Sequence, residues 1–408
     1  MAEIKTEQNL DSNQELEQKS FNEEIEKNNA AISNIIERIK SNNFNVYYYC
    51  PPMNTPSGGI AVIFKQAKIL QNAGFKVTII YEPRQDTKAS YQESQKKAKK
   101  IEIFERFNPT WIGKDAEGIK LQPLGNSEIK FNDNTTEKVE MLSINPEDFV
   151  IIPEGFPNVM ERFTQIPCKK IVFAQSWYYI LNAMSVGQSW RNWGIEDVIS
   201  ISDGISEYIN VIMPGMKIKN YSQSIDRNLF KPKPLSEKFP KIAFMPGRTQ
   251  DAILKTYNVI KTFYSFYPQY RWIRFDELKG LSKEEFAGRL AESSLVLYTD
   301  EIAGFGTMPL EAMACNTHIV GWTPLGGKEY MNATNGFWAH NGEIFQLAEL
   351  LGVAVERLLS GMLDESAVME EYEKTLEKYT PENETESIIK IYNEYKNERI
   401  EELNKLKQ

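Results

Sequence analysis

The sequence predicts an α/β protein in which two Rossmann-like, doubly wound domains face a cleft, preceded by a helical extension. Short β-rich apolar segments alternate with amphipathic helical segments along most of the chain, which indicates parallel sheets covered by helices. The length of 408 residues exceeds what one hydrophobic core usually organises. The Lys-Pro-Lys-Pro segment at 231–234 is typical of a linker between two domains.

Composition and charge narrow the range of functions. The formal net charge of −9 argues against the broad basic surface that non-specific nucleic-acid binding needs, although a local basic groove stays open. No apolar run approaches the about 20 residues that cross a membrane, and the polar, acidic N-terminus is unlike a secretory signal. Cys50, Cys168 and Cys315 lie far apart without metal-ligand spacing, which predicts buried free thiols. We therefore expect a cytoplasmic protein.

Residues 1–41 differ from the rest of the chain, because they are rich in Glu, Gln, Asn and Lys and contain no glycine. The pattern predicts a helix over about 22–40, with the first twenty residues disordered or fraying. Its apolar stripe consists of Ile25, Ile32, Ile35, Ile36 and Ile39. This helix either packs on the domain surface or serves a partner, including a second copy of the chain.

The N-terminal domain is expected over 42–232. Gly58 and Gly59 follow its first strand, at a turn into a helix where backbone N–H groups and the helix dipole favour an anion. A tight turn alone would also use glycine there. Strands are expected at 45–50, 76–81, 149–153, 170–174, 198–202 and 217–222, helices at 61–72, 157–165 and 204–213, and an irregular insertion at 84–147 with a basic helix or loop at 85–100 and strands at 119–121 and 139–142.

The C-terminal domain is expected over 233–380. A long charged helix at 381–408 then lies across the surface and packs back on the N-terminal domain. The domain's strands are expected at 241–245, 271–275, 294–299 and 319–322, and its helices at 251–266, 282–292, 343–359 and 365–378.

Two glycine loops in this domain mark the predicted ligand site. Gly304 and Gly306 bracket Phe305 where a strand hands over to a short helix, and Gly326-Gly327 open a loop after the next strand. Loops at the carboxyl ends of adjacent parallel strands are where an open α/β sheet binds ligands. Arg248 at another strand-to-helix turn suits a phosphate group, and the Glu311 carboxylate suits ribose or sugar hydroxyls. These residues together predict a nucleotide sugar as ligand.

The motif Gly-Phe-Gly at 304–306, the run Leu-Glu-Ala-Met-Ala-Cys at 310–315 and Gly-Gly-Lys-Glu-Tyr at 326–330 resemble the donor-site signature of family-4 retaining glycosyltransferases, which have the two-Rossmann GT-B architecture. Gly58-Gly59, the segment 225–232 and Pro246-Gly247-Arg248 match the same family in order, so the resemblance covers about 44–395. It implies a retaining transferase with a nucleotide-diphosphate sugar as donor substrate, no further cofactor, and the acceptor on the N-terminal domain.

The resemblance also implies roles for single residues. Glu311 resembles the glutamate that holds the nucleotide ribose, and Arg248 the arginine on the donor diphosphate. Gly58 and Gly59 resemble the N-terminal loop that faces this diphosphate. The loops around donor sugar and phosphates correspond to Gly304, Phe305, Gly306, Thr307, Gly326 and Gly327.

The chain departs from the family pattern at two positions. The family usually has another glutamate eight residues before the one that corresponds to Glu311, and this chain has Ala303 at that position. Either Glu301 substitutes for the missing glutamate or the selection of the donor sugar differs. The lysine that commonly follows the arginine by five residues is replaced by Ile253, with Lys255 as the nearest substitute.

Enzymes of the family are thought to let the donor phosphate deprotonate the acceptor, so the protein's task is positioning and charge stabilisation. No Asp-x-Asp motif occurs, so a metal-bridged diphosphate is not expected. Glu154 and Gln175, each just past a strand end, are candidate acceptor or sugar contacts, and loop capping is the alternative for both. His318 is expected to be structural, whereas His340 lies in a loop.

Two other functions stay open. The departures at Ala303 and Ile253 fit a non-catalytic descendant that uses the fold and the N-terminal helix to bind a partner. A nucleotide-sugar epimerase is disfavoured, because the glycine loops and Glu311 fit transferases better. The sequence leaves the acceptor undefined among polysaccharide, lipid-linked sugar, protein and modified nucleic acid.

Overall fold

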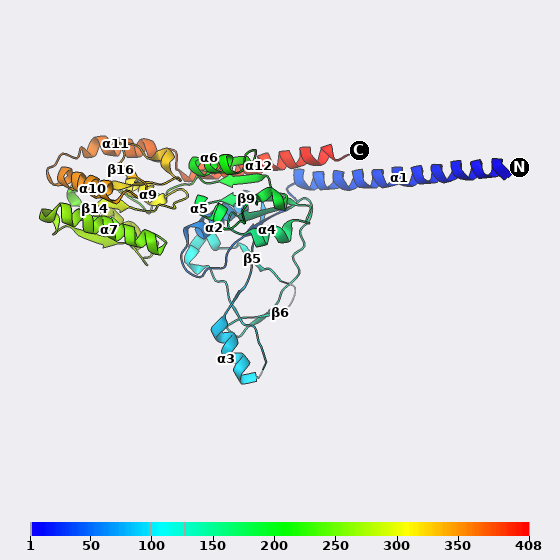
Figure 1. Ribbon diagram of the computed structural model, residues 1–408, viewed down its shortest axis with the longest axis horizontal. Helices are drawn as coiled ribbons and strands as arrows, with labels where there is room; N and C mark the ends of the chain where they lie inside the picture. Colours follow the sequence, from blue (N-terminus) through cyan, green and yellow to red (C-terminus); the bar gives the residue numbers. More distant parts are fainter. Residues whose placement is uncertain (1, 98, 126–127, 408) are drawn as a thin grey trace. The chain divides into compact units, whose positions relative to one another are not determined.

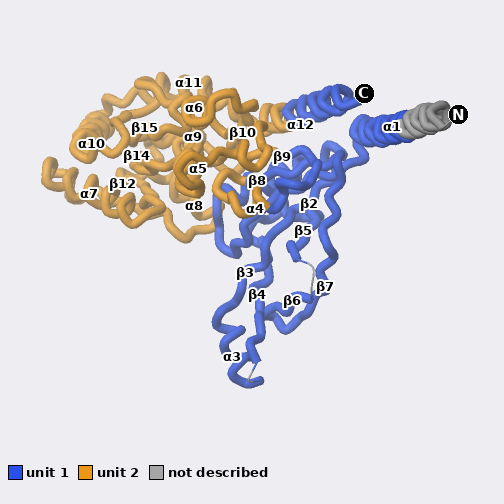
Figure 2. The backbone as a smooth tube through the Cα atoms, turned by 45° about the vertical axis from the view of Figure 1, so that its right-hand side comes forward, with its two compact units in different colours: residues 1–152, 162–170, 389–408 blue, residues 153–161, 171–388 orange. Residues whose placement is uncertain are grey.

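The computed structural model describes residues 2–97, 99–125 and 128–407, and the side chains of the first helix from residue 18 onward. The chain forms two compact units (Figure 2). Unit 1 comprises 1–152, 162–170 and 389–408, and unit 2 comprises 153–161 and 171–388. The predicted domain boundary at 232/233 stays a prediction. Among the described residues, no helix is long and apolar enough to cross a membrane.

The first helix, α1 (Ala2–Lys40), is longer than expected. The prediction that the first twenty residues are disordered or fraying is wrong for 2–20, because they continue the helix without a glycine or proline to end it, and residue 1 lies outside the described residues. The last turns of α1 are held by an apolar contact, in which Ile36 and Ile39 pack against Leu403 of α12 (Pro381–Lys405). In unit 1, Tyr392 of α12 also donates a hydrogen bond from its hydroxyl to the Tyr48 hydroxyl over 2.8 Å.

The sheet of unit 1 is parallel, with the order β8-β1-β2-β5. The central strands β1 and β8 are almost entirely apolar or aromatic, as central parallel strands are, whereas the edge strand β5 contains Lys120 and Gln122. Helix α2 (Gly58–Asn72) joins β1 to β2 and starts three residues earlier than expected, because Gly58 and Gly59 are already helical. The strands are β1 (Asn45–Tyr49), β2 (Lys76–Tyr81), β5 (Lys120–Pro123) and β8 (Phe149–Pro153).

The irregular insertion of unit 1 contains two small antiparallel pairs and a helix (Figures 1 and 2). A minor core of Ile129, Phe131 and Val139 holds it, with Phe104 packed alongside. The predicted strand at 139–142 is wrong, because the pairing ends at Lys138 and Val139 contributes only its side chain. The elements are β3 (Arg84–Gln85), α3 (Thr87–Lys97), β4 (Phe104–Glu105), the 3-10 helix Thr110–Ala116, β6 (Glu128–Lys130) and β7 (Thr136–Lys138).

Unit 2 begins with three parallel strands in the order β11-β10-β9. Short helices follow the strands, and the N-cap hydroxyl of Ser202 accepts the N–H of Ile205 to start the longest of them. The elements are α4 (Pro157–Phe163), β9 (Lys169–Ala174), α5 (Trp177–Asn182), the 3-10 helix Trp190–Trp193, β10 (Asp197–Ser200), α6 (Asp203–Ile212) and β11 (Lys217–Asn220).

A second parallel sheet follows in unit 2, with the order β13-β12-β14-β15-β16. Its core is continuous from Phe263 through Leu297 and Trp322 to Leu351. Strand β13 begins three residues later than expected, because residues 268–270 form a 3-10 turn first. The elements are β12 (Phe239–Phe244), α7 (Gln250–Phe266), β13 (Arg274–Glu277), α8 (Lys283–Ala291), β14 (Ser293–Tyr298), α9 (Thr307–Ala314), β15 (His318–Thr323), β16 (Phe337–His340), α10 (Ile344–Leu359) and α11 (Glu365–Leu376).

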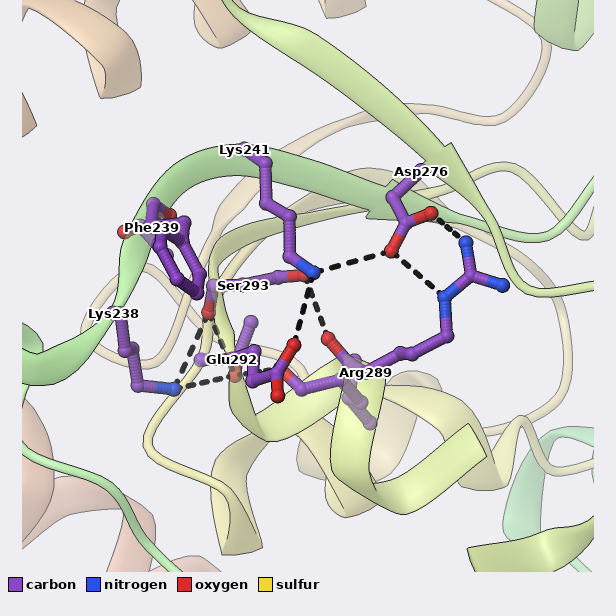
Figure 3. Close-up of polar contacts among 10 residues, drawn as sticks. Lys238, Phe239, Lys241, Asp276, Arg289, Glu292 and Ser293 are labelled. Carbon is purple, nitrogen blue, oxygen red and sulfur yellow. Dashed lines mark hydrogen bonds and ion pairs between the residues drawn. The ribbon is translucent and has the colours of Figure 1, made fainter. Parts of the chain in front are cut away.

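Ion pairs and hydrogen bonds fasten the amino ends of this sheet (Figure 3). Lys241 Nζ lies 3.3 Å from Asp276 Oδ2, and Arg289 Nε donates to the same carboxylate over 3.0 Å. Lys238 is buried, and its ammonium donates to the carbonyls of Ser293 and Cys315 and to the Thr317 hydroxyl. These contacts hold β12, β13 and β14 together, whereas ligands of open α/β sheets bind at the carboxyl ends of the strands.

Candidate functional site at the carboxyl ends of the second sheet

The loop after β14 meets the loop after β12 through a cation. Arg248 Nη2 lies 3.0 Å from Asp300 Oδ2 and donates to the carbonyl of Ile302 over 3.2 Å. The two strands are neighbours in the sheet, so their following loops emerge side by side. Arg248 is exposed, so its guanidinium can exchange the carboxylate for another anion.

A second cation reaches the same loop. Lys255, in the second turn of α7, lies 3.0 Å from both carboxylate oxygens of Glu301 and 2.9 Å from Asp251. Asn341, just after β16, donates from its side chain to the Glu301 carbonyl over 3.3 Å. Lys255 therefore faces the loop that follows β14, and its role as the substitute lysine stays a prediction. In this structure both cations are neutralised by acidic residues of the loop, Asp300 and Glu301.

The glycine loops pack against backbone. A Cβ at Gly304 would lie 1.6 Å from the carbonyl oxygen of Gln175, and a Cβ at Gly326 would lie 1.8 Å from the carbonyl oxygen of Gly304. Real side chains do not approach backbone this closely, so only glycine fits either position. The Ser202 hydroxyl donates to the Gly304 carbonyl over 2.8 Å and completes the contact. Gly304 and Gly326 are thus required by packing within unit 2.

The start of α9 is shaped by Gly306 and by two tyrosines. Gly306 has φ +75°, in the left-handed region, and is the N-cap of the helix. The Tyr330 hydroxyl donates to the carbonyls of Phe305 and Gly306, and the Phe305 ring lies edge-on to that of Tyr330. Gly327 also has a positive φ, and a Cβ there would meet the Phe305 carbonyl. The two predicted loops therefore form one packed structure, with Thr307 as the first residue of α9.

Glu311 lies in the second turn of α9 and is partly exposed. Burial raises the pKa of its carboxyl to about 7, while the positive charge of Lys283 acts in the other direction. Within the part of the chain that the structure describes, no hydrogen bond engages its side chain. A partly exposed carboxyl that accepts no hydrogen bond from the described residues is suited to hydroxyl groups of a ligand.

Ala303 is 2% exposed and lies in the packed part of the loop. A glutamate there would bring a carboxylate into the interior, where it would need a partner. The missing family glutamate therefore cannot simply be restored at this position. Glu301, two residues earlier, is 16% exposed in its side chain and is bound to Lys255.

Glu154 and Gln175 are joined by backbone hydrogen bonding. Glu154 is buried, and its Oε1 accepts the N–H of Ser176 over 2.7 Å. Burial raises the pKa of Glu154 to about 7, while backbone N–H groups lower it. The Ser176 hydroxyl donates to the Ile302 carbonyl over 3.3 Å. Glu154 thus fixes the loop whose Gln175 carbonyl abuts Gly304, and direct contact of Glu154 or Gln175 with a substrate stays a prediction.

Gly58 stands in a different environment, since a Cβ there would meet no atom within 4 Å. It begins α2 in unit 1 and its φ is not in the left-handed region. Its backbone N–H and that of Gly59 lie in the first turn of the helix, where such groups have no intrahelical acceptor. The ligand-facing role of both residues stays a prediction.

The histidines and cysteines are accounted for by burial and exposure. His318 is buried, and burial lowers the pKa of its imidazole to about 4, which confirms a structural position. His340 is exposed. The three cysteines are buried free thiols, as predicted. Among the described residues, no group of three acidic, His or Cys side chains is placed to hold a metal.

Reasoning from the sequence brought together Arg248, Lys255, Glu301 and the glycine loops, which the structure places on one edge of the second sheet. It missed the residues that lock this edge, namely Asp300 as the partner of Arg248, Ser176 and Ser202 as donors to the loop, and Asn341. Ser176 and Ser202 each lie two residues after a strand end, which was a usable signal. Asp300 and Asn341 have no signal apart from their position next to other loop residues.

Comparison with known proteins supports the fold. The chain is 23% identical over 239 residues to an α-1,6-glucosyltransferase of Actinobacillus pleuropneumoniae serotype 7, covering 55% of this chain and 68% of that protein. No known family description matches the chain.

Three solved structures share the fold over most of their length. TarM of S. aureus aligns with a TM-score of 0.57 at 11% identity, covering 87% of this chain and 99% of TarM. The pneumococcal O-GlcNAc transferase GtfA, solved with UDP and GlcNAc, aligns at 0.56 and 11%, covering 88% and 99%. Anabaena HepE in complex with UDP aligns at 0.56 and 12%, covering 86% and 100%. The chain therefore has the GT-B glycosyltransferase fold, built on two parallel sheets.

Proposed function

We propose that the chain is a glycosyltransferase that moves a sugar from a nucleotide-diphosphate donor to an acceptor hydroxyl. The observation that carries the proposal is the convergence of Arg248, Lys255 and the packed glycine loops at the carboxyl edge of the second sheet. Its relative is named a glucosyltransferase, and two of its structural neighbours were solved with UDP. UDP-hexoses are therefore the first donors to examine.

In this proposal Arg248 and Lys255 neutralise the donor diphosphate. Both cations are engaged by Asp300 and Glu301 in the structure, so these carboxylates must give way when a diphosphate arrives. Glu311 accepts hydrogen bonds from the ribose hydroxyls, and the N–H groups at the start of α9, from Gly306 and Thr307, face the donor phosphates. Gly58, Gly59, Phe305 and Gly327 complete the proposed donor contacts.

The proposed reaction proceeds with retention and without a metal. The acceptor oxygen bonds to the anomeric carbon as the bond from that carbon to the diphosphate breaks, and the acceptor proton passes to the departing phosphate oxygen. Arg248 and Lys255 stabilise the negative charge that develops on the diphosphate. Glu154 and Gln175 would position the acceptor side, and Glu301 would contact the donor sugar once it leaves Lys255. The free thiols are consistent with action in the cytoplasm.

Purified protein with radiolabelled UDP-hexoses tests the proposal through donor hydrolysis or transfer. Arg248→Ala and Glu311→Ala should each lower kcat/KM at least a hundredfold, because each removes a contact to the donor. Arg271→Ala, an exposed arginine beyond α7, is the matched control and should leave activity unchanged. Full activity in both site variants would refute the assignment of the donor site.

A non-catalytic binding protein is the second candidate. The comparisons do not favour it, since the relative is named a glucosyltransferase. It is motivated by the ion pairs of Arg248 with Asp300 and of Lys255 with Glu301, because both proposed diphosphate ligands already have acidic partners. The long helix α1, with Phe21 exposed, would then bind a partner or a second copy of the chain. Calorimetric titration with UDP, GDP and ADP separates the two candidates, and an absence of affinity for all three would favour the binding protein. A full-length chain that is a dimer, and a variant truncated in α1 that is a monomer, would support the same conclusion.

A further inference from the structure

We propose that four aromatic residues of unit 2, Trp177, Tyr178, Tyr179 and Tyr208, form a platform that binds a hexose unit of an oligosaccharide acceptor. The inference rests on the proposed function and names the acceptor class for it. Trp177, Tyr178 and Tyr179 form the first turn of α5, and Tyr208 lies in α6. We call these four rings the aromatic platform.

The four rings are in continuous contact. Trp177 lies edge-on to Tyr208 and to Tyr178, with ring centroids 6.0 Å apart in both pairs, and Tyr178 lies edge-on to Tyr179 at 5.4 Å. Edge-to-face contacts of this kind hold aromatic rings in fixed orientations. The Trp177–Tyr208 contact also ties α5 to α6. The platform is therefore a preformed surface and needs little ordering to receive a ligand.

The platform is open to solvent. Tyr179 is 43% exposed, and the other three rings are partly exposed. Leu181, which follows on α5, is exposed as well. An exposed group of aromatic and apolar side chains on a soluble protein marks a binding surface more often than a single exposed apolar residue does.

Polar groups of the platform lack partners within the described chain. No hydrogen bond engages the hydroxyls of Tyr178, Tyr179 and Tyr208 among the residues that the structure describes, and these three residues are partly or fully exposed. The indole N–H of Trp177 also has no acceptor there, but it is buried and does not face the open side of the platform. A hexose presents C–H groups on its ring faces and hydroxyls at its rim. Aromatic faces with hydroxyl groups at their edges complement both features, as in other apolar sites with a few polar groups.

The platform adjoins the proposed donor site through backbone contact. Trp177 is two residues from Gln175, so their Cα atoms lie at most about 7 Å apart. The Gln175 carbonyl is packed directly against Gly304, and the Ser176 hydroxyl donates to the Ile302 carbonyl. Glu154 holds the intervening N–H of Ser176. The loop from Gln175 to Ser176 thus fixes the distance between the platform and the glycine loop of the donor site.

The charge around the platform selects against an anionic ligand. The nearest charged residues on α6 are acidic, Asp203 and Glu207, and Glu207 is paired with Lys328 over 2.7 Å. No free lysine or arginine is contributed by α5, whose sequence is entirely uncharged. A neutral oligosaccharide fits this surface better than a phosphorylated polymer or an acidic lipid does.

An oligosaccharide array that includes α-1,6-linked glucans, probed with the labelled full chain, tests the platform. We expect the wild-type protein to capture at least one neutral hexose oligosaccharide. Tyr179→Ala and Tyr208→Ala should weaken this binding at least tenfold, and Tyr179→Phe should weaken it less, since the ring is kept. Val211→Ala, exposed on α6 but outside the four rings, is the matched control and should bind as the wild type does.

Titration of UDP into the same variants separates the platform from the donor site. UDP affinity should be equal in wild type, Tyr179→Ala and Val211→Ala, and equal thermal unfolding would show that all three are folded. Capture of no neutral oligosaccharide by the wild type, or undiminished capture by Tyr179→Ala and Tyr208→Ala, would overturn the platform. A wild-type protein that captures oligosaccharide but has no affinity for UDP, GDP or ADP would instead overturn the proposed function and keep the platform.

Discussion

Gly58 and Gly304 each lie in a connection from a strand to a helix, but the surroundings of the two glycines differ. A Cβ at Gly304 would collide with the Gln175 carbonyl, whereas a Cβ at Gly58 would meet open space. Packing alone therefore explains Gly304, and packing explains nothing about Gly58. A glycine in a strand-to-helix turn is informative about a ligand only when the protein itself leaves room for a side chain there.

The largest effect is expected from adding a side chain at the packed position. Gly304→Ala should lower the free energy of unfolding by about 3 kcal/mol or more, because the obstacle at 1.6 Å is backbone and cannot rotate away. Urea unfolding monitored by tryptophan fluorescence measures this. Gly326→Ala should behave alike, since its Cβ would meet the Gly304 carbonyl at 1.8 Å. Unchanged stability in both variants would show that the loops are not packed as described.

A second effect concerns the residue that fixes the loop against Gly304. The folded-state pKa of Glu154, about 7, is above its ordinary value of 4.5, so the native state binds more protons between these pH values. Its stabilising contribution is complete below about pH 4.5 and is lost as the pH rises through 7. Relative to Glu154→Gln, the wild type should lose on the order of 2 kcal/mol between pH 4.5 and pH 8.

Urea titrations of the wild type and of Glu154→Gln at several pH values check this difference. The comparison with Glu154→Gln removes the contributions of all other titrating groups. Parallel stability curves for the two proteins would contradict the raised pKa of Glu154.

A third, smaller effect concerns the carboxyl of Glu311 in α9, the helix that follows the packed loop. The raised pKa of Glu311, about 7, means that the carboxyl becomes protonated below neutral pH and accepts hydrogen bonds less strongly. UDP affinity of the wild type should fall up to tenfold between pH 8 and pH 5.5. Glu311→Gln should bind more weakly at pH 8 and show little change with pH. A wild-type affinity that is flat over this range would remove Glu311 from the ribose contact.

The smallest effect on stability is expected at the open position. Gly58→Ala should change the free energy of unfolding by no more than about 1 kcal/mol, and alanine is the better helix former in the first turn of α2. If the residue faces a ligand, the same variant should weaken UDP binding while stability is kept. If Gly58→Ala lost stability but bound UDP as the wild type does, Gly58 would be required for packing and not for ligand binding.

The parallel strands and most helices could be predicted from the sequence, because their apolar runs and caps are local signals. Strand β13 was placed three residues too early, since the apolar pattern does not reveal the 3-10 turn that precedes it. The predicted first helix is too short, because low hydrophobicity indicates disorder, whereas the segment is rich in the helix formers Glu, Gln and Lys and has no glycine or proline. The prediction of a strand at 139–142 mistook one buried valine for a pairing segment.

The sequence predicted which residues form the candidate site, but it did not predict which of their side chains form ion pairs. Arg248, Lys255 and Glu311 were found from their positions after strands and in helices. That Asp300 would bind Arg248, and Glu301 would bind Lys255, depends on loop conformations that no local pattern encodes. The burial of Ala303 follows from the contacts of the glycine loops with each other, which are equally non-local.

The most direct measurement of the central claim is calorimetric titration of UDP into the wild type, Arg248→Ala and Asp300→Asn. We expect measurable affinity in the wild type and at least tenfold weaker binding in Arg248→Ala, since the variant lacks the guanidinium that meets the diphosphate. Asp300→Asn should bind UDP more tightly than the wild type, because its side chain no longer neutralises Arg248. Equal affinity in all three proteins would contradict a diphosphate site at this edge of the sheet.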